Sequence, residues 1–544
     1  MLGKVQRRDA SSVLQPWARG HPPATLPPFS PARPALRRAA LKLIFLVFCA
    51  FLGVFYGLAF AVFPPSLLIY LGFPILIALL VVIWALPDQG HPPSRLLTQL
   101  FLAYAVVWVM WPNYLALQLP GLPWISMRRI FGFPLALVFL ICMSISPRFR
   151  EELRRALAGI PLLWKLVMAF LFVQWVTIAM SADPFRSLNI VVNHTILNVT
   201  TFFVAAWVFH HAGRAEAWTR MIIGTVIVLS VIAGIEFQQQ KVLWADYIPS
   251  FLAVTDESVQ RTLSGQVRDG AYRVVTTFTV PLSMAEYLAL VTPFVLQKLL
   301  NKSGMIWRLF YVSVDGLILA AAIWTGARLG IVGWIVAHVA VGCLWSYQRW
   351  RTNKSDMLGP ALALGIPALA LAFSVAMFTV PAVKYRTIGG GSTTLSDQGR
   401  QEQFDRLGPI VLRNPVGHGA GNSGAVLQYR TASGMFTVDS FVITLLIDFG
   451  VVGFILFTLM VLVPAIQMAI FSLKKRGDEL DLVLSLAGSL AVYVNVRLVL
   501  SQDDNSAIIY MLLGMTTALA ARIKATDVGA AGLMTGRSPA RPAA

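Results

Sequence analysis

Apolar runs recur along nearly the whole chain and alternate with short polar segments. About fourteen of them could cross a hydrocarbon core of ~30 Å as an α-helix, which takes roughly 20 residues. The pattern therefore predicts an all-α, polytopic integral membrane protein with about 12–14 transmembrane helices. The predicted spans are residues 41–63, 66–86, 97–115, 130–146, 161–181, 189–210, 219–237, 280–298, 309–326, 329–346, 359–380, 440–468, 481–499 and 505–521.

Composition supports this class. Hydrophobic residues make up 57% of the 544 residues and charged residues 13%, whereas soluble domains carry about 25% charged residues. The mean hydropathy is +0.69. A net charge of +19 would suit nucleic acid, but the chain contains no basic soluble module. We therefore expect no nucleic-acid partner, and expect the basic loops to contact anionic membrane lipids.

The basic residues also orient the predicted helices. Five short connections are basic and fall on one side of the membrane when the spans are counted in order: "SPRFREELRR", "HHAGRAEAWTR", "QKLLNKSGMIWR", "SYQRWRTNK" and "SLKKRGDELD". Lys and Arg are enriched in cytoplasmic loops, so we expect an even number of spans with both termini in the cytoplasm. The two long connections, 238–279 and 381–439, then lie on the outer side.

Four parts of the chain follow from this count. They are a disordered basic cytoplasmic leader (1–40), N-terminal transmembrane helices (41–219), a second transmembrane domain that includes the outer loop 381–439 (220–521), and a disordered cytoplasmic tail (522–544). Cys49, Cys142 and Cys343 all lie within apolar runs. We expect them to be small core residues and not disulfides or metal ligands.

The outer loop 381–439 is basic on the side of the membrane where Lys and Arg are disfavoured. Its segment "SDQGRQEQFDRL" has apolar residues at helical spacing and a possible cap at Ser396, so it predicts a short helix. Gly408-Pro409 is expected to break or restart that helix. The run "RNPVGHGAGNSG" follows, and the loop ends at Asp439, where the next apolar run begins.

Three charged residues stand at the outer ends of different predicted spans: Arg273, Arg328 in "TGARLG", and Asp439. If their helices are neighbours, all three can face one cavity. Arginine binds phosphate oxygens in pairs, and fixed cations stabilise a departing diphosphate. A carboxylate nearby could accept the proton of an attacking sugar hydroxyl. Other interpretations stay open, because interfacial arginines also snorkel to headgroups and aspartate also caps helices.

Further polar residues are weaker candidates. His418 also fits a solvated loop histidine, and the glycines around it also fit a simple turn. Ionisable residues within spans are functional candidates by default. Those here are Glu286, Asp315, His194 and His338. Asp503-Asp504 is predicted on the outer side, but two adjacent acids without further ligands are weak evidence for a metal.

The run "RNPVGHGAGNSG", followed by "VDSFVITLLIDFGVVGF", resembles the O-antigen ligase and O-antigen polymerase superfamily of bacterial membrane glycosyltransferases. That pattern has a proline, G-x-G-x-G in a large periplasmic loop, a polar pair that starts the next helix, an acidic residue and G-x-x-G. The matching residues are Pro415, Gly417, Gly419, Gly421, Asp439-Ser440, Asp448, Gly450 and Gly453. Two further segments resemble the family, "TGARLG" with Thr325 and Arg328, and "YRVVTTFTVPLSMAEYLAL" with Arg273. The resemblance covers about 220–520.

The resemblance implies a glycosyltransferase-C-like fold in the bacterial inner membrane and a role in surface polysaccharide biosynthesis. It implies an inverting transfer, without metal or cofactor, of a glycan from undecaprenyl diphosphate to a glycan or lipid acceptor at the periplasmic face. Arg273 and Arg328 would hold the diphosphate. Substrate contacts are expected from Arg400, Arg406, His418, Gly419 and Ser440.

One position departs from the family pattern. Ligases typically carry His-Asn at the polar pair, with the histidine as the proposed base, whereas this chain has Asp439-Ser440. The difference favours a polysaccharide polymerase or a divergent ligase-like enzyme, with Asp439 as a candidate base.

The main alternative is a transporter or flippase of lipid-linked oligosaccharide, which would also have many spans and cationic sites. Such a transporter should show repeat symmetry and charged or broken helices near the midplane, whereas polarity here concentrates in one outer loop. Metal-dependent sugar transferases are a weaker alternative, because they usually need acids in the first outer loop and "PPS" at 64–66 has none.

Overall fold

The computed structural model describes residues 77–534, apart from 89, 91, 119–123, 253–256, 269, 302–303, 381–393, 431–433 and 435, and also Leu43, Val47, Ala50, Phe51 and Val54. The chain forms two compact units, Met1–Ile77 and Ala78–Ala544. The predicted leader 1–40 and most of the span 41–63 lie outside the described residues. The span 66–86 is described from Ile77 onward, where a helix runs over 77–84.

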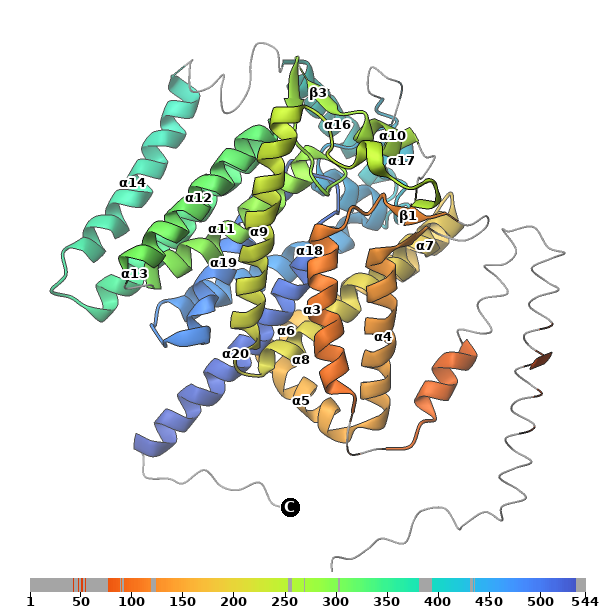
Figure 1. Cartoon of the computed structure of the whole chain (residues 1–544), viewed down its shortest axis with the longest axis horizontal. Helices are drawn as coiled ribbons and strands as arrows, with labels where there is room; N and C mark the ends of the chain where they lie inside the picture. The colour runs from red at the N-terminus through yellow and green to blue at the C-terminus, as the bar shows by residue number, and fades with distance from the viewer. Residues whose placement is uncertain are drawn as a thin grey trace, which may run out of the picture. The chain divides into compact units, whose positions relative to one another are not determined.

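The second unit is a bundle of α-helices (Figure 1). Ten described helices are long and apolar enough to cross a membrane, and α3 is a shorter apolar helix. A further helix, α11, is buried almost throughout. Every predicted span from 97–115 onward coincides with one of these helices. The prediction of an all-α polytopic membrane protein is therefore confirmed.

The first half of this unit contains α3 (Ser94–Met110), α4 (Met127–Ile145), α5 (Pro147–Leu157), α6 (Pro161–Thr177), η1 (Ile178–Met180), α7 (Pro184–His194), the π-turn η2 (Thr195–Val199), α8 (Thr200–His210) and α9 (Arg214–Gln239). The second half contains η3 (Ala245–Tyr247), η4 (Ser250–Leu252), α10 (Glu257–Leu263), α11 (Pro281–Asn301), α12 (Met305–Trp324), α13 (Arg328–Thr352), α14 (Leu358–Thr379), α16 (Thr394–Arg413), α17 (Ser423–Leu427), α18 (Phe441–Ser472), η6 (Asp478–Leu482), α19 (Val483–Arg497) and α20 (Ser506–Met534). Two antiparallel hairpins pair β1 (Ala116–Leu117) with β2 (Ile125–Ser126), and β3 (Gln266–Arg268) with β4 (Ala271–Arg273).

The hairpins, α10, α16 and α17 gather at one end of the bundle, here called the loop end (Figure 1). Hydrogen bonds join these connections to one another. Trp244 Nε1 donates to Tyr114 Oη at 2.9 Å, and Tyr114 Oη donates to the Thr276 carbonyl at 3.4 Å. The polar connections between spans therefore form one layer over the helix ends.

Small residues let the central helices pack closely. A Cβ at Gly514 of α20 would lie 2.5 Å from Ala205 Cβ of α8, and a Cβ at Gly333 of α13 would lie 2.7 Å from Ala289 Cβ of α11. Close contact of this kind is how apolar helices associate where lipid is as apolar as the side chains. It places α11 and α20 in the bundle interior.

The end opposite the loop end is fixed by a buried acid. Glu479 accepts hydrogen bonds from the backbone N–H groups of Gly213 and Ala215 at 2.9 and 2.6 Å, and Arg522 donates to it at 2.7 Å. The first N–H groups of α9 have no partner within the helix, so a carboxylate there satisfies them and suits the helix dipole.

Two boundaries differ from the predictions. The helix α16 runs through Gly408-Pro409 to Arg413, although a break was expected there. Its apolar residues Leu407 and Ile410 pack with α17 and α18, and this packing outweighs the one backbone hydrogen bond that Pro409 cannot make. The last helix continues to Met534, past the predicted end at 521, since 522–534 contain no proline. Residues 535–544 of the predicted tail lie outside the described part.

Candidate functional site

Arg273 and the turn that carries Arg328 lie together at the loop end. Arg273 closes the β3–β4 hairpin, and its Nε donates to the Thr325 carbonyl at 3.0 Å. Gly326 has φ +60°, and a Cβ there would lie 3.1 Å from Arg273 Cγ. Arg328, two residues further, is the first residue of α13. The two arginines that the sequence singled out therefore come from neighbouring segments.

A buried carboxylate holds the chain that follows Arg273. Glu236 of α9 is fully buried and accepts hydrogen bonds from the backbone N–H groups of Val275 and Thr276, both at 2.9 Å. Tyr272 Oη donates to the same carboxylate at 2.9 Å. Burial and the neighbouring Glu236 raise the pKa of Tyr272, which keeps it a neutral donor. Glu236 was not predicted from the sequence, because only its buried contacts identify it.

Arg328 also lines an apolar cavity of about 750 Å³ between α13 and α14. Ile331, Leu369 and Phe373 are among its walls, and the polar side chains besides Arg328 are His338 and Ser374. His338 pairs with Asp315, with Nε2 at 3.2 Å from Oδ2. A guanidinium at the end of an apolar cavity suits a ligand with an anionic head and a hydrocarbon chain.

Asp439 stands just before α18, with its carboxylate turned to α16. Gln403 Nε2 donates to Asp439 Oδ2 at 3.2 Å, while Gln403 Oε1 accepts the Asp439 backbone N–H at 3.0 Å. Thr437 donates to Oδ1 at 3.4 Å. The N-cap of α18 is Ser440, so the interpretation of Asp439 as its cap is wrong. The buried Ser440 hydroxyl has no hydrogen-bond partner among the described residues.

The glycine-rich run forms a joint between three segments, here called the glycine joint (residues 415–422 and 448–450). The helix α18 kinks at Gly450, where φ is +66°. This kink frees carbonyls that accept from the loop: His418 N–H donates to Ile447 O at 2.8 Å and Gly419 N–H to Asp448 O at 2.9 Å. The run is therefore more than the simple turn considered from sequence.

Positive φ values make glycine necessary in this joint. Gly417, Gly419 and Gly421 have φ values of 108°, 83° and 80°. A Cβ at Gly419 would lie 2.7 Å from Ser181 Cβ, and one at Gly450 would lie 2.1 Å from the Pro415 carbonyl. The joint thus connects the loop to α18 and to the α6–α7 connection, which are far apart in sequence.

The two loop arginines predicted to contact substrate lie on α16. Arg406 pairs with Glu402, donates to the Gln428 carbonyl at 3.0 Å and lies 5.8 Å from the Tyr429 ring. It therefore attaches α16 to the end of α17. Arg400 is half-buried, one turn from Gln403 on the same helix.

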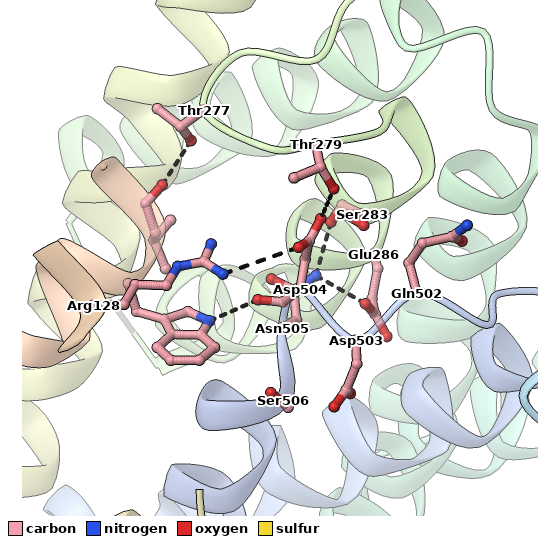
Figure 2. A network of polar contacts seen from close by, with 12 residues as sticks. Arg128, Thr277, Thr279, Ser283, Glu286, Gln502, Asp503, Asp504, Asn505 and Ser506 are labelled. Atoms are coloured by element: carbon pink, nitrogen blue, oxygen red, sulfur yellow. Dashed lines mark hydrogen bonds and ion pairs between the residues drawn. The ribbon is translucent and has the colours of Figure 1, made fainter. Parts of the chain in front are cut away.

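A second polar cluster at the loop end was not assigned from sequence. Figure 2 shows Arg128 and Thr279 turned toward Asp504. Arg128 Nη1 lies 4.0 Å from Asp504 Oδ1, and Thr279 donates to Oδ2 of the same carboxylate. Trp108 donates to the Asp504 carbonyl at 2.7 Å. The cluster joins α3, α4 and the α19–α20 connection.

Arg497 extends this cluster into the bundle. Its Nε lies 3.3 Å from Glu286 Oε1, and its Nη2 lies 3.3 Å from Asp503 Oδ1. Asn505 donates to Glu286 Oε2 at 2.8 Å (Figure 2). Burial raises the pKa of Asp503 to about 6, opposed by Arg497 and assisted by Asp504. Glu286 therefore forms an ion pair with Arg497, a partner that could not be identified from the sequence.

One sequence signal could have found part of this cluster. Arg128 and Arg129 fall in the outer connection between the predicted spans 97–115 and 130–146, where basic residues are disfavoured. The same test selected Arg273 and Arg328. No group of three or more His, Cys, Asp or Glu residues suited to a metal occurs in the described part of the chain.

Residues 314–458 match the model of the O-antigen ligase family. The resemblance to the O-antigen ligase and polymerase superfamily is confirmed. The matched segment contains Arg328, Asp439 and the whole glycine joint, whereas Arg273 and Arg128 lie outside it. No curated protein matches the chain significantly. The match supports a ligase- or polymerase-like role in surface glycan biosynthesis and a lipid-linked glycan as partner.

Proposed function

We propose that the chain is a membrane glycosyltransferase that moves a glycan from a polyprenyl diphosphate, of the undecaprenyl type, to an acceptor sugar hydroxyl. The reaction takes place at the periplasmic face of the bacterial inner membrane, and both termini are cytoplasmic. The observation that carries the proposal is the hydrogen bond from Arg273 to the turn that opens α13 at Arg328. It brings two arginines to one end of the bundle, beside an apolar cavity.

The donor lies with its diphosphate on Arg273 and Arg328 and with its prenyl chain in the apolar cavity. Two planar guanidinium groups bind phosphate oxygens in pairs and keep their charge at every physiological pH. They stabilise the negative charge that grows on the diphosphate as its bond to the sugar breaks. Apolar walls such as Leu369 and Phe373 suit the hydrocarbon chain.

Asp439 is the base in this proposal. The acceptor oxygen attacks the anomeric carbon from the face opposite the diphosphate, the carbon–diphosphate bond breaks, and the hydroxyl proton passes to the carboxylate. Each oxygen of Asp439 accepts one side-chain hydrogen bond, from Gln403 or Thr437. A carboxylate has about four lone-pair sites, so both oxygens retain capacity for that proton. Such a transfer inverts the anomeric centre and uses no metal or cofactor.

Of the remaining predicted contacts, Ser440 directly follows Asp439 in the chain. Ser440, whose hydroxyl has no hydrogen-bond partner among the described residues, is the candidate for binding the acceptor. Arg400, Arg406, His418 and Gly419 are placed on α16 or in the glycine joint. We propose that Arg400 contacts the glycan, and that the other three shape the loop against which the glycan lies.

Purified protein in proteoliposomes, supplied with a lipid-linked repeat unit and EDTA, tests this function. We expect longer glycan chains for a polymerase, or a glycan attached to an added acceptor for a ligase. Arg273→Lys and Arg328→Lys should each lower product formation by about 10²- to 10³-fold, because lysine keeps the charge and loses the planar fork. Arg351→Lys, in the last turn of the same helix α13, is the matched control and should keep wild-type activity. Movement of the donor across the bilayer without a new glycosidic bond would instead indicate a flippase.

A further inference from the structure

A cavity of about 740 Å³ opens between α4, the segment from α6 to η2 and α18–α20 at the loop end. It is distinct from the apolar cavity at Arg328, and the two share no lining residue. Its walls combine aromatic rings with amide, carboxylate and guanidinium groups. They include Trp108, Trp124, Phe441, Asn189, Asn193 and Arg128. Nothing in the family match or in the proposed chemistry assigns this cavity a ligand.

Several polar atoms on the walls are buried without a hydrogen-bond partner among the described residues. They are Arg128 Nε, Gln174 Oε1, His194 Nδ1, Asp448 Oδ1 and Tyr510 Oη. The side chains of Arg128, Gln174, Asp448 and Tyr510 belong to residues that are at most 5% exposed. A buried polar group left without a partner destabilises the fold. Their gathering around one cavity indicates a ligand or water that supplies many partners.

The chemistry of these atoms indicates the class of ligand. Arg128 Nε is a donor, Gln174 Oε1 and Asp448 Oδ1 are acceptors, and Tyr510 Oη can do either. Sugar hydroxyls donate and accept, so a glycan can satisfy all of them. Wall charges of both signs, with Asp504 facing Arg128 at 4.0 Å, suit a neutral ligand better than a polyanion such as a diphosphate. The half-buried ring of Trp124 offers a face for the apolar side of a sugar ring, whereas the ring of Trp108 is buried and has the Arg128 guanidinium over it at 4.4 Å.

The cavity lies next to the chain segment that carries Asp439, the proposed base. Phe441, on its wall, is two residues from Asp439. Ser501, also on the wall, donates to the carbonyl of Val438, the residue before Asp439. A glycan in the cavity would thus end near the residue that we propose as base. Thr279, six residues after Arg273 in the chain, donates to Asp504, which is another residue of the cavity wall.

We propose that this cavity binds the acceptor glycan of the transfer reaction. The role of the bound glycan as acceptor rests on the proposed function, whereas carbohydrate binding in the cavity does not depend on it. The sugar rings lie on the aromatic walls, and their hydroxyls pair with Gln174, His194, Asp448 and Tyr510. The terminal sugar lies at the Phe441 side of the cavity, next to the segment that carries Asp439.

Two variants remove unpartnered atoms with little change of volume: Tyr510→Phe removes the hydroxyl, and Gln174→Leu removes the side-chain amide with its Oε1. The probe is a set of short oligosaccharides cut by mild acid from the surface polysaccharide of the source cells. Binding is measured on the full chain in lipid nanodiscs by calorimetry. We expect each variant to bind the oligosaccharides about 5- to 100-fold more weakly, as for loss of a buried hydrogen-bond partner. Tyr287→Phe is the matched control. The Tyr287 hydroxyl pairs with Thr225 at 2.7 Å, and Tyr287 does not line the cavity.

The outcomes separate this inference from the proposed function. Arg328→Lys should lose transfer but still bind free oligosaccharide with wild-type affinity. Unchanged oligosaccharide affinity in both cavity variants would overturn the inference. The variants could instead weaken binding only of the oligosaccharide that is linked to polyprenyl diphosphate. That result would assign the cavity to the donor and would also overturn the inference. Loss of oligosaccharide binding in Tyr510→Phe, together with normal transfer in Arg328→Lys, would keep the carbohydrate site and reject the proposed chemistry.

Discussion

Arg328 and Arg128 occupy equivalent places in different surroundings. Arg328 is the first residue of α13 and Arg128 the second residue of α4, and both helices begin at the loop end. Arg328 borders a cavity of aliphatic and aromatic side chains, whereas Arg128 borders a cavity rich in amides and acids and faces Asp504. The same residue type in the first turn of a helix thus suits a lipid phosphate in one case and a glycan in the other. The residues that surround an arginine therefore indicate its ligand better than the arginine itself does.

The largest expected effect belongs to Asp439, the proposed base. Asp439→Asn keeps the shape and the hydrogen bond with the Gln403 amide, but removes the proton acceptor. We expect glycan transfer to fall by roughly 10²- to 10⁴-fold, the usual contribution of a positioned base. Binding of the lipid donor and of the oligosaccharide should stay at wild-type affinity. Transfer within about threefold of wild type would mean that Asp439 is not the base.

The next prediction contrasts the two arginines directly. Arg328→Lys should lower transfer by about 10²- to 10³-fold, because a preorganised donor to a developing anion contributes that much. Arg128→Lys should weaken oligosaccharide binding and reduce transfer much less, about 10-fold, since it leaves the leaving group untouched. Both are measured by product formation at saturating donor. Equal losses in the two variants would remove the distinction between a phosphate site and a glycan site.

The sequence could predict one side of this comparison and not the other. The helical periodicity, the charge on the outer side and the motif around Arg328 are all local, so the class of fold and the arginine pair were predictable. The partner of Arg128 is not local, because Asp504 follows almost the whole bundle along the chain. From the sequence alone, the adjacent acids Asp503 and Asp504 were therefore only weak evidence for a metal site.

The glycine joint had the same limitation. The motif of three glycines was evident, but its reason lies in the kink at Gly450, which offers the Ile447 and Asp448 carbonyls to the loop. A glycine inside an apolar helix gives no such signal, because glycine is common in membrane helices. Likewise, Pro409 predicted a break that the packing of Leu407 and Ile410 overrides.

A change in the apolar cavity should act on one substrate only. Ala370→Trp places a large ring in the space between α13 and α14. We expect KM for a full-length polyprenyl donor to rise about 10-fold, the order of effect for one to a few methylenes misfitting a hydrophobic pocket. A donor with a much shortened prenyl chain should be used as well as by wild type. Equal effects on both donors would place the prenyl chain elsewhere.

The glycine joint should respond in stability before activity. Gly419→Ala combines a φ of +83° with a Cβ that would lie 2.7 Å from Ser181 Cβ. A left-handed conformation costs about 1–2 kcal/mol for a residue with a Cβ, so we expect the thermal unfolding midpoint to fall by several degrees. Gly408→Ala, with open space around it in α16, is the control and should match or exceed wild type. A Gly419→Ala midpoint equal to that of the control would show that the joint tolerates a side chain.

The smallest effect concerns pH at the edge of the polar cavity. Around Asp503 stand Arg497 and Tyr493 of α19, Glu286 of α11, Tyr510 of α20 and its neighbour Asp504. Its pKa is raised to about 6, so between pH 4 and pH 6 the folded chain keeps a proton that the unfolded chain has lost. Stability from this group is therefore present at low pH and declines as pH rises toward 6. The side chain is 49% exposed, which limits the effect to about one degree in the unfolding midpoint.

Asp503→Asn should remove this decline, which is measured as the difference in the unfolding midpoint between pH 5 and pH 7. A decline as steep in the variant as in wild type would assign the pH dependence to another group.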